Sequence, residues 1–206
     1  MSQQDWNDNY LEGALPWDTG KPEPVLVEMV TSGALLPGRG IEIGSGTGTN
    51  TIWLASQGFD MLGVDIAPRA IEMAREKATD YAKAQFAVAD ILTDPLAAES
   101  YDFAFDRGCF HIFDESKLRA QFAQHLADGL RPGGLWLSLI GSTEGPARDY
   151  GPPRRSARDI VDAIEPSLEI LRLESVSFTG GQPGAPAAWM CLARKREMPA
   201  QPSTSR

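Results

Sequence analysis

The sequence contains little cysteine, with Cys109 and Cys191 as its 2 cysteines among 206 residues. Two cysteines so far apart make neither the disulfide framework of a small secreted domain nor a paired Cys-x-x-Cys metal site. Long apolar runs are also missing, and the first residues lack the basic start and apolar stretch of a signal peptide. We therefore expect a cytoplasmic protein with no membrane partner.

Positive charge is also scarce, because 19 Lys and Arg face 28 Asp and Glu, which gives a net charge of -9. Proteins that bind nucleic acid neutralise its phosphates with Lys and Arg. We therefore expect a small-molecule partner and no nucleic acid. The sequence leaves open whether the protein is a monomer or a homodimer.

The hydrophobic content of 42% is enough for a packed core, and the length fits one domain. Residues 198–206 are polar and lack apolar periodicity, which predicts a flexible tail. Residues 1–197 then form a single domain. Within it, residues 1–24 are expected to be an N-terminal arm that acts as a lid, because glycine and proline interrupt this stretch.

Short apolar runs alternate with helical patterns, which predicts a parallel β-sheet covered by helices. The last two strands are expected to pair as an antiparallel hairpin at the edge, and residues 131–134, Arg-Pro-Gly-Gly, are expected to form a turn. The predicted strands are 40–43, 60–65, 84–89, 101–106, 135–140, 168–178 and 187–194. The predicted helices are 49–56, 68–78, 118–130 and 156–163.

A glycine-rich loop, Gly44-Ser45-Gly46-Thr47-Gly48, lies between the first predicted strand and its helix. Glycines allow positive φ and close approach to a ligand, and a helix start offers free N–H groups. The alternative is a tight turn that serves packing alone. In this context the loop predicts a cofactor site.

Two acids strengthen this prediction. Asp65 ends the second strand, near the offset of about 20 residues at which an acid meets ribose hydroxyls in nucleotide-binding folds. Asp90 and Ile91 end the third strand, where they suit the adenine amino group and ring face. Each acid alone could be a helix cap or a solvated loop residue. Together, three consecutive strand ends predict one crevice for a nucleoside.

The cofactor class follows from two positions. Thr49 stands where a dinucleotide fingerprint needs its third glycine, which counts against a nicotinamide-dependent oxidoreductase. Glu42, two residues before the first glycine, would repel a pyrophosphate but suits the amino-acid end of S-adenosylmethionine. A protein that binds this cofactor without turnover is a further alternative.

The order of these motifs, completed by Leu130-Arg131-Pro132-Gly133-Gly134, resembles that of class I S-adenosylmethionine-dependent methyltransferases over about residues 10 to 195. The resemblance implies an α/β fold: a Rossmann-like, seven-stranded, mostly parallel sheet with helices on both faces and its last strand antiparallel. It also implies an enzyme that converts S-adenosylmethionine to S-adenosylhomocysteine. The cofactor-binding residues implied are Trp17, Glu42, Gly44, Ser45, Gly46, Gly48, Asn50, Asp65, Ile66, Asp90, Ile91 and Asp106.

Three further segments are similar to the thiopurine, thiol and halide methyltransferase group: Pro16-Trp17-Asp18-Thr19-Gly20, Asp106-Arg107-Gly108 and Gly151-Pro152-Pro153. Arg154 departs from that group, which has an aromatic residue after the double proline. The resemblance implies methylation of a small thiol or another soft nucleophile, such as sulfide or halide. Methylation of oxygen or nitrogen on a small molecule is the alternative, since one fold hosts many acceptors.

The residues after the fourth strand are the catalytic candidates: Asp106, Arg107 and His111. Arg107 could steady an anionic acceptor, and His111 could accept a proton near neutral pH or simply be a packed ring. A thiol needs little base catalysis, because it ionises near pH ~8.5. The substrate-contacting candidates are Arg107, Phe110, Pro153 and Arg154.

Trp17 is the candidate lid residue, because an indole face attracts a sulfonium cation. Alternatively, Trp17 only pins the arm to the core. Cys109, His111 and Asp114 match no standard zinc spacing, and methyl transfer from a sulfonium requires no metal. We therefore expect no metal site.

Overall fold

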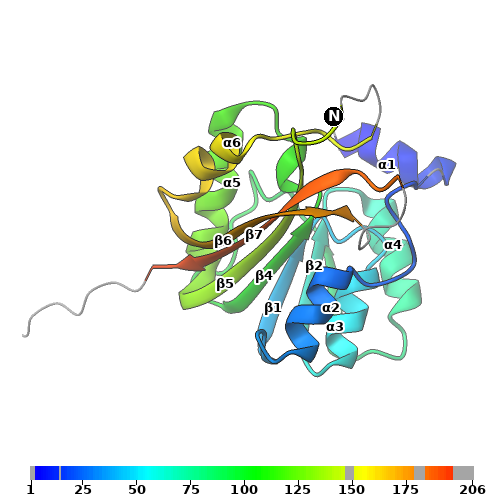
Figure 1. Cartoon of the computed structure of the whole chain (residues 1–206). Helices are drawn as coiled ribbons and strands as arrows, with labels where there is room; N and C mark the ends of the chain where they lie inside the picture. The colour runs from blue at the N-terminus through cyan, green and yellow to red at the C-terminus, as the bar shows by residue number, and fades with distance from the viewer. Residues whose placement is uncertain (1–2, 14, 147–150, 179–183, 197–206) are drawn as a thin grey trace, which may run out of the picture.

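The computed structural model describes residues 3–13, 15–146, 151–178 and 184–196, and these form one seven-stranded sheet with helices on both faces (Figure 1). The architecture confirms the predicted α/β class. The tail predicted over 198–206 lies outside the described residues.

The strands lie in the order β3-β2-β1-β4-β5-β7-β6. All neighbouring pairs are parallel except those made by β7, which runs antiparallel to both β5 and β6. The predicted hairpin is therefore present, with β6 and not β7 at the edge. The strands are β1 Arg39–Ile43, β2 Asp60–Asp65, β3 Ala84–Val88, β4 Tyr101–Arg107, β5 Leu130–Gly141, β6 Leu168–Ser177 and β7 Ala187–Lys195.

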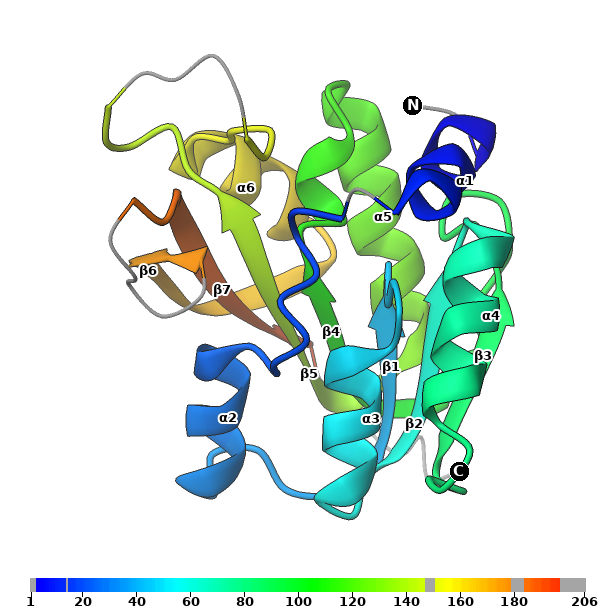
Figure 2. The same ribbon diagram turned by 90° about the vertical axis from the view of Figure 1, so that its right-hand side faces the viewer.

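Helices α2, α3 and α4 cover one face of the sheet, and α5 and α6 cover the other (Figures 1 and 2). Leu26 of α2 and Leu54 of α3 are buried against Phe103 on the first face, whereas Phe122 of α5 is buried against Trp136 on the second. The helices are α1 Gln3–Glu12, α2 Pro24–Thr31, α3 Thr49–Ser56, α4 Pro68–Lys77, α5 Ser116–Gly129 and α6 Ala157–Ile164, with a short 3₁₀ helix, η1, at Phe110–Ile112.

The turn predicted at residues 131–134 is instead a bulge inside β5. Tyr101 pairs with Leu130 and Phe103 pairs with Leu135, so the four intervening residues have few opposite partners. Gly133 takes a φ of 77°, which glycine adopts without strain. The Pro-Gly-Gly segment therefore forms a bulge within β5, which has already begun at Leu130.

The site is positioned by the reversal of strand order at β1, which has β2 on one side and β4 on the other. Ligands of open α/β sheets bind beyond the carboxyl ends of the strands at such a point. Figure 2 shows α1 at this end of the molecule, and the chain between α1 and α2 crosses above β1 and β4. The arm expected over residues 1–24 thus contains a helix that the sequence did not indicate.

Candidate cofactor and active site

The glycine loop combines positive φ with close contacts. Gly44, Gly46 and Gly48 have φ values of 67°, 53° and 82°. A Cβ on Gly44 would lie 2.9 Å from the Cβ of Cys109, and one on Gly48 would lie 2.7 Å from the ring of Phe86. No other residue fits these positions without strain, so the loop presents bare backbone at the carboxyl end of β1.

Asp65 fixes the glycine loop from the end of β2. Its Oδ2 accepts the N–H of Gly46 and its Oδ1 accepts the N–H of Ala67, both at 2.9 Å. Burial raises the pKa of Asp65, although these hydrogen bonds act in the opposite direction. A carboxylate has about four acceptor positions. Asp65 can therefore hold the loop and still accept ribose hydroxyls.

Other predicted cofactor residues flank these two groups. Ser45 is buried, and its N–H donates to the carbonyl oxygen of Val64 at 2.9 Å. Half-buried Ile66 follows Asp65. Half-buried Asp90 follows β3, and its Oδ1 accepts the N–H of Leu92 at 2.9 Å. Ile91 is buried in the core beside it. The loop, Asp65 and Asp90 therefore follow three adjacent strands, as predicted.

Glu42, a predicted cofactor-binding residue, is hydrogen-bonded to helix α3. Its side chain is buried, where it accepts the amide of Asn50 at 3.0 Å and the hydroxyl of Thr51. Burial raises the pKa of Glu42 to about 7, against the opposing effect of these hydrogen bonds. Glu42 thereby orients Asn50, whose Oδ1 accepts the N–H of Glu23 at 2.9 Å. A contact between Glu42 and the cofactor stays a prediction.

The N-terminal arm is fastened to the glycine loop through Asp18. Its carboxylate accepts the hydroxyl of Thr47 at 2.5 Å and the N–H of Gly20 at 3.0 Å, and Lys77 lies 3.6 Å away. Burial opposes the charged form, but these hydrogen bonds and the charge of Lys77 outweigh it and lower the pKa of Asp18. The Pro-Trp-Asp segment thus holds the arm against the loop.

Aromatic side chains of the arm form a further set of contacts near the glycine loop. Trp17 makes edge-to-face contacts with Trp6 and Tyr10, with centroid distances of 5.7 Å and 6.1 Å. Tyr10 is buried, and its hydroxyl would lie 3.0 Å from a Cβ on Gly46. Burial and the charge of Asp65 raise the pKa of Tyr10. These three side chains also pack with Ala67 and Ala70, which pins the arm to the core. The sulfonium role of Trp17 stays a prediction.

Sequence reasoning missed Tyr10. A single tyrosine in the polar helix α1 has no helical apolar partner except Trp6 to indicate that it is buried.

Asp106 is enclosed at the end of β4. Its Oδ2 accepts the N–H groups of Cys109 at 3.1 Å and Phe110 at 3.0 Å, and its Oδ1 accepts Nε1 of Trp136 at 3.0 Å. Burial raises the pKa of Asp106 to about 6 despite these bonds. Asp106 has no exposed surface and orients η1. Its direct contact with cofactor or substrate stays a prediction.

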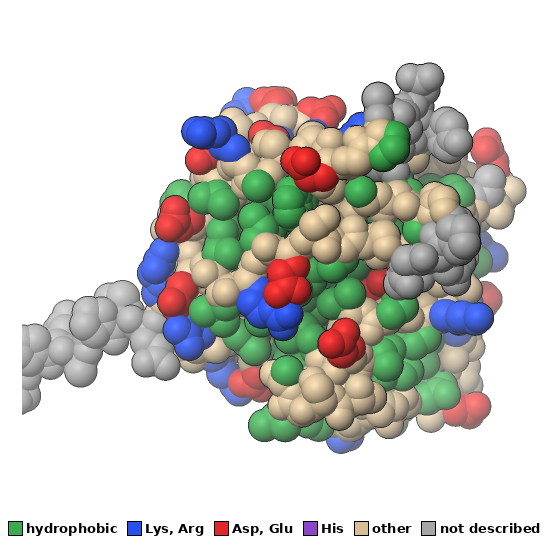
Figure 3. All heavy atoms as spheres, viewed as in Figure 1, with side chains coloured by type: hydrophobic (Ala, Val, Ile, Leu, Met, Phe, Trp, Pro, Cys, Tyr) green, Lys and Arg blue, Asp and Glu red, His purple; other side chains and the backbone are tan. Residues whose placement is uncertain are grey.

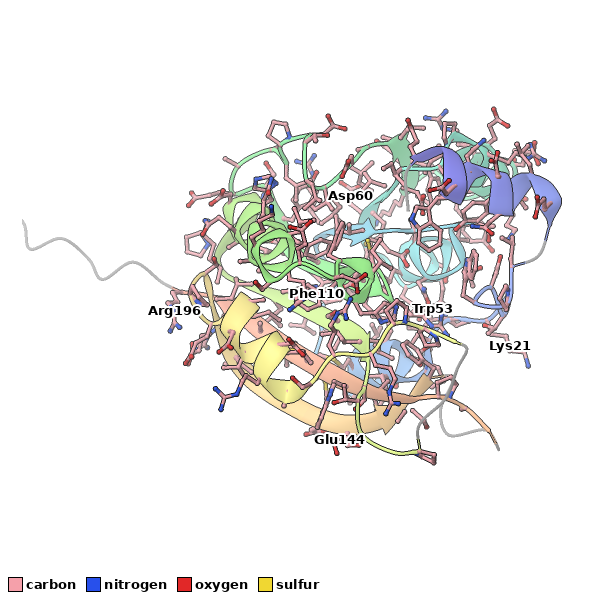
Figure 4. The ribbon with its side chains drawn as sticks, turned by 90° about the horizontal axis from the view of Figure 1, so that it is seen from above. Lys21, Trp53, Asp60, Phe110, Glu144 and Arg196 are labelled. Atoms are coloured by element: carbon pink, nitrogen blue, oxygen red, sulfur yellow. The ribbon has the colours of Figure 1, made fainter. Side chains whose placement is uncertain are left out.

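Phe110, a predicted substrate contact, has its side chain in the core, and its contact with a substrate stays a prediction. Its side chain is fully buried and packs edge-to-face on Phe122 and Trp136, with centroids 5.7 Å and 5.6 Å away. Figure 4, which looks down on the carboxyl ends of the strands, has Phe110 near its centre and Lys21 and Glu144 at its periphery. Phe110 therefore belongs to the core beneath the site, because apolar burial outweighs its proximity in sequence to Arg107.

His111 is buried under the segment that follows β5. Its Nδ1 lies 2.7 Å from the backbone nitrogen of Gly141. A backbone N–H can only donate, so Nδ1 must accept and the ring proton is on Nε2. Protonating Nδ1 would break this bond. The geometry therefore favours the packed, hydrogen-bonded ring over the general base.

The Gly-Pro-Pro loop is held by its own arginine. Arg154 donates from Nε to the carbonyl oxygen of Ser142 at 2.8 Å and from Nη2 to those of Thr143, Glu144 and Gly145. The Nε and Nη2 of Arg154 are thus bonded to the chain after β5, and its contact with the acceptor stays a prediction.

Pro153 is exposed and packs its main chain on β5. Its carbonyl oxygen would lie 2.1 Å from a Cβ on Gly141. The side chain of Pro153 therefore remains at the surface near the site, where a role as a substrate contact stays a prediction.

Arg107 and Glu23 form an ion pair across the carboxyl end of β4. The Nε of Arg107 donates to Oε2 of Glu23 at 2.6 Å, and its Nη1 donates to the carbonyl oxygen of Trp17 at 3.2 Å. The guanidinium also lies 5.1 Å from the ring centroid of Phe178. Sequence reasoning missed Glu23, because an acid between two prolines before a helix indicates a cap and gives no sign of burial.

The described ranges contain neither a metal-binding cluster nor a membrane-spanning helix. No group of three or more His, Cys, Asp or Glu side chains there is arranged to hold a metal ion. None of the helices within those ranges is long and apolar enough to span a bilayer.

The residues present fit S-adenosylmethionine. Bare backbone at Gly44 to Gly48 allows close approach, Asp65 has acceptor positions for a ribose, and Asp90 follows the next strand. The aromatic arm lies over the same end of the sheet. When bound, this cofactor supplies an activated methyl group on a sulfonium.

The comparisons with known proteins agree. A family model described as a methyltransferase domain matches residues 41–134. The chain is 33% identical over 181 residues to the probable thiol methyltransferase 2 of Arabidopsis thaliana, which covers 86% of this chain and 76% of that protein. It is 30% identical over 176 residues to thiocyanate methyltransferase 1 of Brassica oleracea, covering 84% and 75%.

A solved structure described as "Conversion of a Disulfide Bond into a Thioacetal Group during Echinomycin Biosynthesis" has a TM-score of 0.77 and 28% identity, covering 90% of this chain and 86% of that chain. Given this agreement of sequence, fold and cofactor-shaped site, the protein belongs to the class I S-adenosylmethionine-dependent methyltransferases, is a small-molecule methyltransferase, and within that family resembles the thiol methyltransferase group.

Proposed function

We propose that this enzyme transfers the methyl group of S-adenosylmethionine to the sulfur of a small thiol or to a comparably soft, anionic nucleophile. The similarity to a probable thiol methyltransferase and a thiocyanate methyltransferase supports this acceptor class. The observation that carries the proposal is the engagement of both acid-base candidates near β4, Asp106 and His111, in hydrogen bonds to the protein itself.

An acceptor at this site must then ionise without a protein base. A thiol does so near pH ~8.5, and its thiolate is the nucleophile. Phenols ionise near pH ~10 and alkyl ammonium groups near pH ~10.4, so they stay protonated at neutral pH. Soft anions need no deprotonation at all. The thiol and anion acceptors are therefore favoured over oxygen and nitrogen, which remain the alternative.

The tasks left to the protein are positioning and exclusion of water. Holding two reactants in an attack geometry can contribute about 7–11 kcal/mol to lowering a barrier. Asp106 orients η1, Asp65 orients the glycine loop, and the arm over residues 1–24 covers the carboxyl end of the sheet. We propose that the glycine loop, Asp65 and Asp90 bind the cofactor while Trp17 closes over it.

The test is a pH profile of kcat/KM for a series of aryl thiols that differ in acidity but not in size. We expect the midpoint of each profile to follow the pKa of the thiol. A single midpoint shared by all thiols would assign the proton to a protein base and overturn the proposal. Phenols of matched shape should react at least about 100-fold more slowly, since a missing base costs about 10²-fold or more.

His111 offers a matched pair of variants for the same question. His111→Asn keeps an acceptor that can reach the N–H of Gly141, whereas His111→Ala removes it. With a thiol acceptor we expect kcat of His111→Asn to stay within about threefold of wild type, well short of the ~10²-fold effect of losing a base. Both variants losing about 10²-fold or more while folded would identify His111 as the base.

We further propose that the chain is a single methyltransferase domain over residues 1–197, works in the cytoplasm as a monomer or homodimer, and has no nucleic-acid or membrane partner. The net charge of -9 supports the absence of a nucleic-acid partner. Figure 3 shows acidic and basic side chains interspersed with hydrophobic ones on the face in view. Such a mixture on this face provides no basic stripe for phosphates.

A further inference from the structure

The side chain of Glu23 is buried with one oxygen unused. Only 1% of the side chain is exposed. Oε2 accepts from Arg107, but Oε1 has no hydrogen-bond partner within the described part of the chain. A buried acceptor without a partner costs about 1–3 kcal/mol, and more when it is charged. Such an atom at the edge of a cofactor site indicates a partner that arrives with the ligand.

The position of Glu23 on the sheet suggests which part of the ligand that is. Asp65 and Asp90 lie beyond β2 and β3, on one side of β1, where they suit ribose and adenine. Arg107 ends β4, on the other side of β1. A cofactor whose adenosine lies over β2 and β3 therefore extends its methionine end toward Arg107 and Glu23.

The charges of this end match the pair. The amino-acid end of the cofactor carries an α-ammonium and an α-carboxylate at neutral pH. We propose that Glu23 and Arg107 together clamp this zwitterion, with Oε1 of Glu23 accepting from the ammonium and Nη2 of Arg107 donating to the carboxylate. The Nε and Nη1 of Arg107 are already used by Glu23 and Trp17, which leaves Nη2 for the ligand.

The clamp is held in place before the ligand binds. Glu42 accepts from Asn50, and Asn50 accepts the backbone N–H of Glu23, so a buried chain of hydrogen bonds runs from β1 to the arm. A pair that is already oriented loses less entropy when it binds. Glu42, expected to meet the amino-acid end itself, thus also supports Glu23 in that task.

The test compares two ligands that differ only in this end. S-adenosylhomocysteine carries the amino-acid group, whereas 5′-methylthioadenosine keeps the adenosine and thioether without it. Calorimetric titration of both into wild type and Glu23→Gln should show the affinity for S-adenosylhomocysteine falling by about tenfold or more, as for a lost hydrogen bond to a charged group. The affinity for 5′-methylthioadenosine should stay within about twofold. Glu28→Gln, at an exposed position on helix α2, which directly follows Glu23, is the matched control.

Three outcomes would overturn the clamp. Equal losses for both ligands would mean that Glu23 only supports the site as a whole, and no loss for either would mean that Oε1 meets nothing in the cofactor. An unchanged affinity with a raised KM for the acceptor would assign the pair to the acceptor. If Glu23→Gln fails to fold by circular dichroism, Arg107→Gln is titrated with the same two ligands and judged by the same ratio. Because the calorimetric comparison needs no acceptor, its result is independent of the proposed thiol specificity.

Discussion

Glu42 and Asp106 place two carboxyl groups in the interior, each near the carboxyl end of a central strand and each with hydrogen-bond donors on both oxygens. Both pKa values are raised by burial, which favours the neutral acid. The two acids thus orient Asn50 and η1 around the site. Keeping these buried carboxyl groups ionised at neutral pH lowers the free energy of unfolding.

Replacing Glu42 with Gln should remove part of this cost. Burial raises the pKa of Glu42 from 4.5 to about 7, so the folded state holds this proton more tightly than the unfolded state. The stabilisation of the folded state by the proton on Glu42 is complete below about pH 4.5 and is lost as the pH rises through about 7. From about pH 4.5 to 8, the unfolding free energy of wild type should fall by about 3 kcal/mol relative to Glu42→Gln.

Denaturant titrations of both proteins across this range measure the difference, and the contribution of Asp106 cancels because both proteins contain it. A difference between the two proteins that does not change with pH would contradict the raised pKa of Glu42.

The element that we expect to affect ligand access most is the N-terminal arm over residues 1–24, which contains α1. Trp17→Ala removes the edge-to-face contacts with Trp6 and Tyr10, each worth about 0.5–1.5 kcal/mol beyond buried area. We expect the affinity for S-adenosylhomocysteine to fall by about tenfold, since ~1.4 kcal/mol is a factor of ten.

Comparing the two cofactor forms by calorimetry separates the two roles of Trp17. If the indole also faces the sulfonium, the affinity for S-adenosylmethionine falls further than that for the uncharged product. Equal losses leave Trp17 as a pin alone, and unchanged affinities for both would reject a lid. Leu11→Ala, on the exposed side of α1, is the control.

The central elements of the fold could be predicted because their patterns are local. The helix at Thr49–Ser56 and the strand at Asp60–Asp65 have the predicted bounds, since a glycine loop and a Gly-Phe break delimit them. Helix α1 was not predicted because its sequence is mostly polar and it packs through Trp6 and Tyr10 rather than through an apolar stripe. The bulge in β5 was not predicted because pairing of Leu130 with Tyr101 is a tertiary event.

The candidate site divides in the same way. Glycine positions and strand-end acids are visible in sequence because topology brings them to one edge. Whether a polar side chain faces ligand or protein depends on contacts between distant residues. Asp106 is hydrogen-bonded to Trp136, His111 to Gly141 and Arg107 to Glu23. The two members of these pairs lie 30, 30 and 84 positions apart in the sequence. No local pattern reports such pairs.

At the scale of the whole molecule, the site is a row of strand ends in the order β3, β2, β1 and β4, covered by an arm bound to the glycine loop by Asp18. In the binding mode we propose, adenine lies beyond β3, ribose beyond β2, and the methionine end extends toward β4. Binding should therefore stabilise the entire domain, because it joins segments from the arm to β4 that unfold together.

A thermal-shift measurement checks this coupling. A ligand at about 100 times its Kd adds about 2.7 kcal/mol to the unfolding free energy. For a chain of this length, 1 kcal/mol raises Tm by about 2–4 °C, so S-adenosylhomocysteine should raise it by about 5–10 °C. Asp65→Asn should lose most of this shift, because its amide cannot accept on both sides as the carboxylate does. NADH should leave Tm unchanged, since Thr49 replaces the glycine that a dinucleotide needs. A shift with NADH, or none with S-adenosylhomocysteine at high concentration, would contradict the assigned cofactor site.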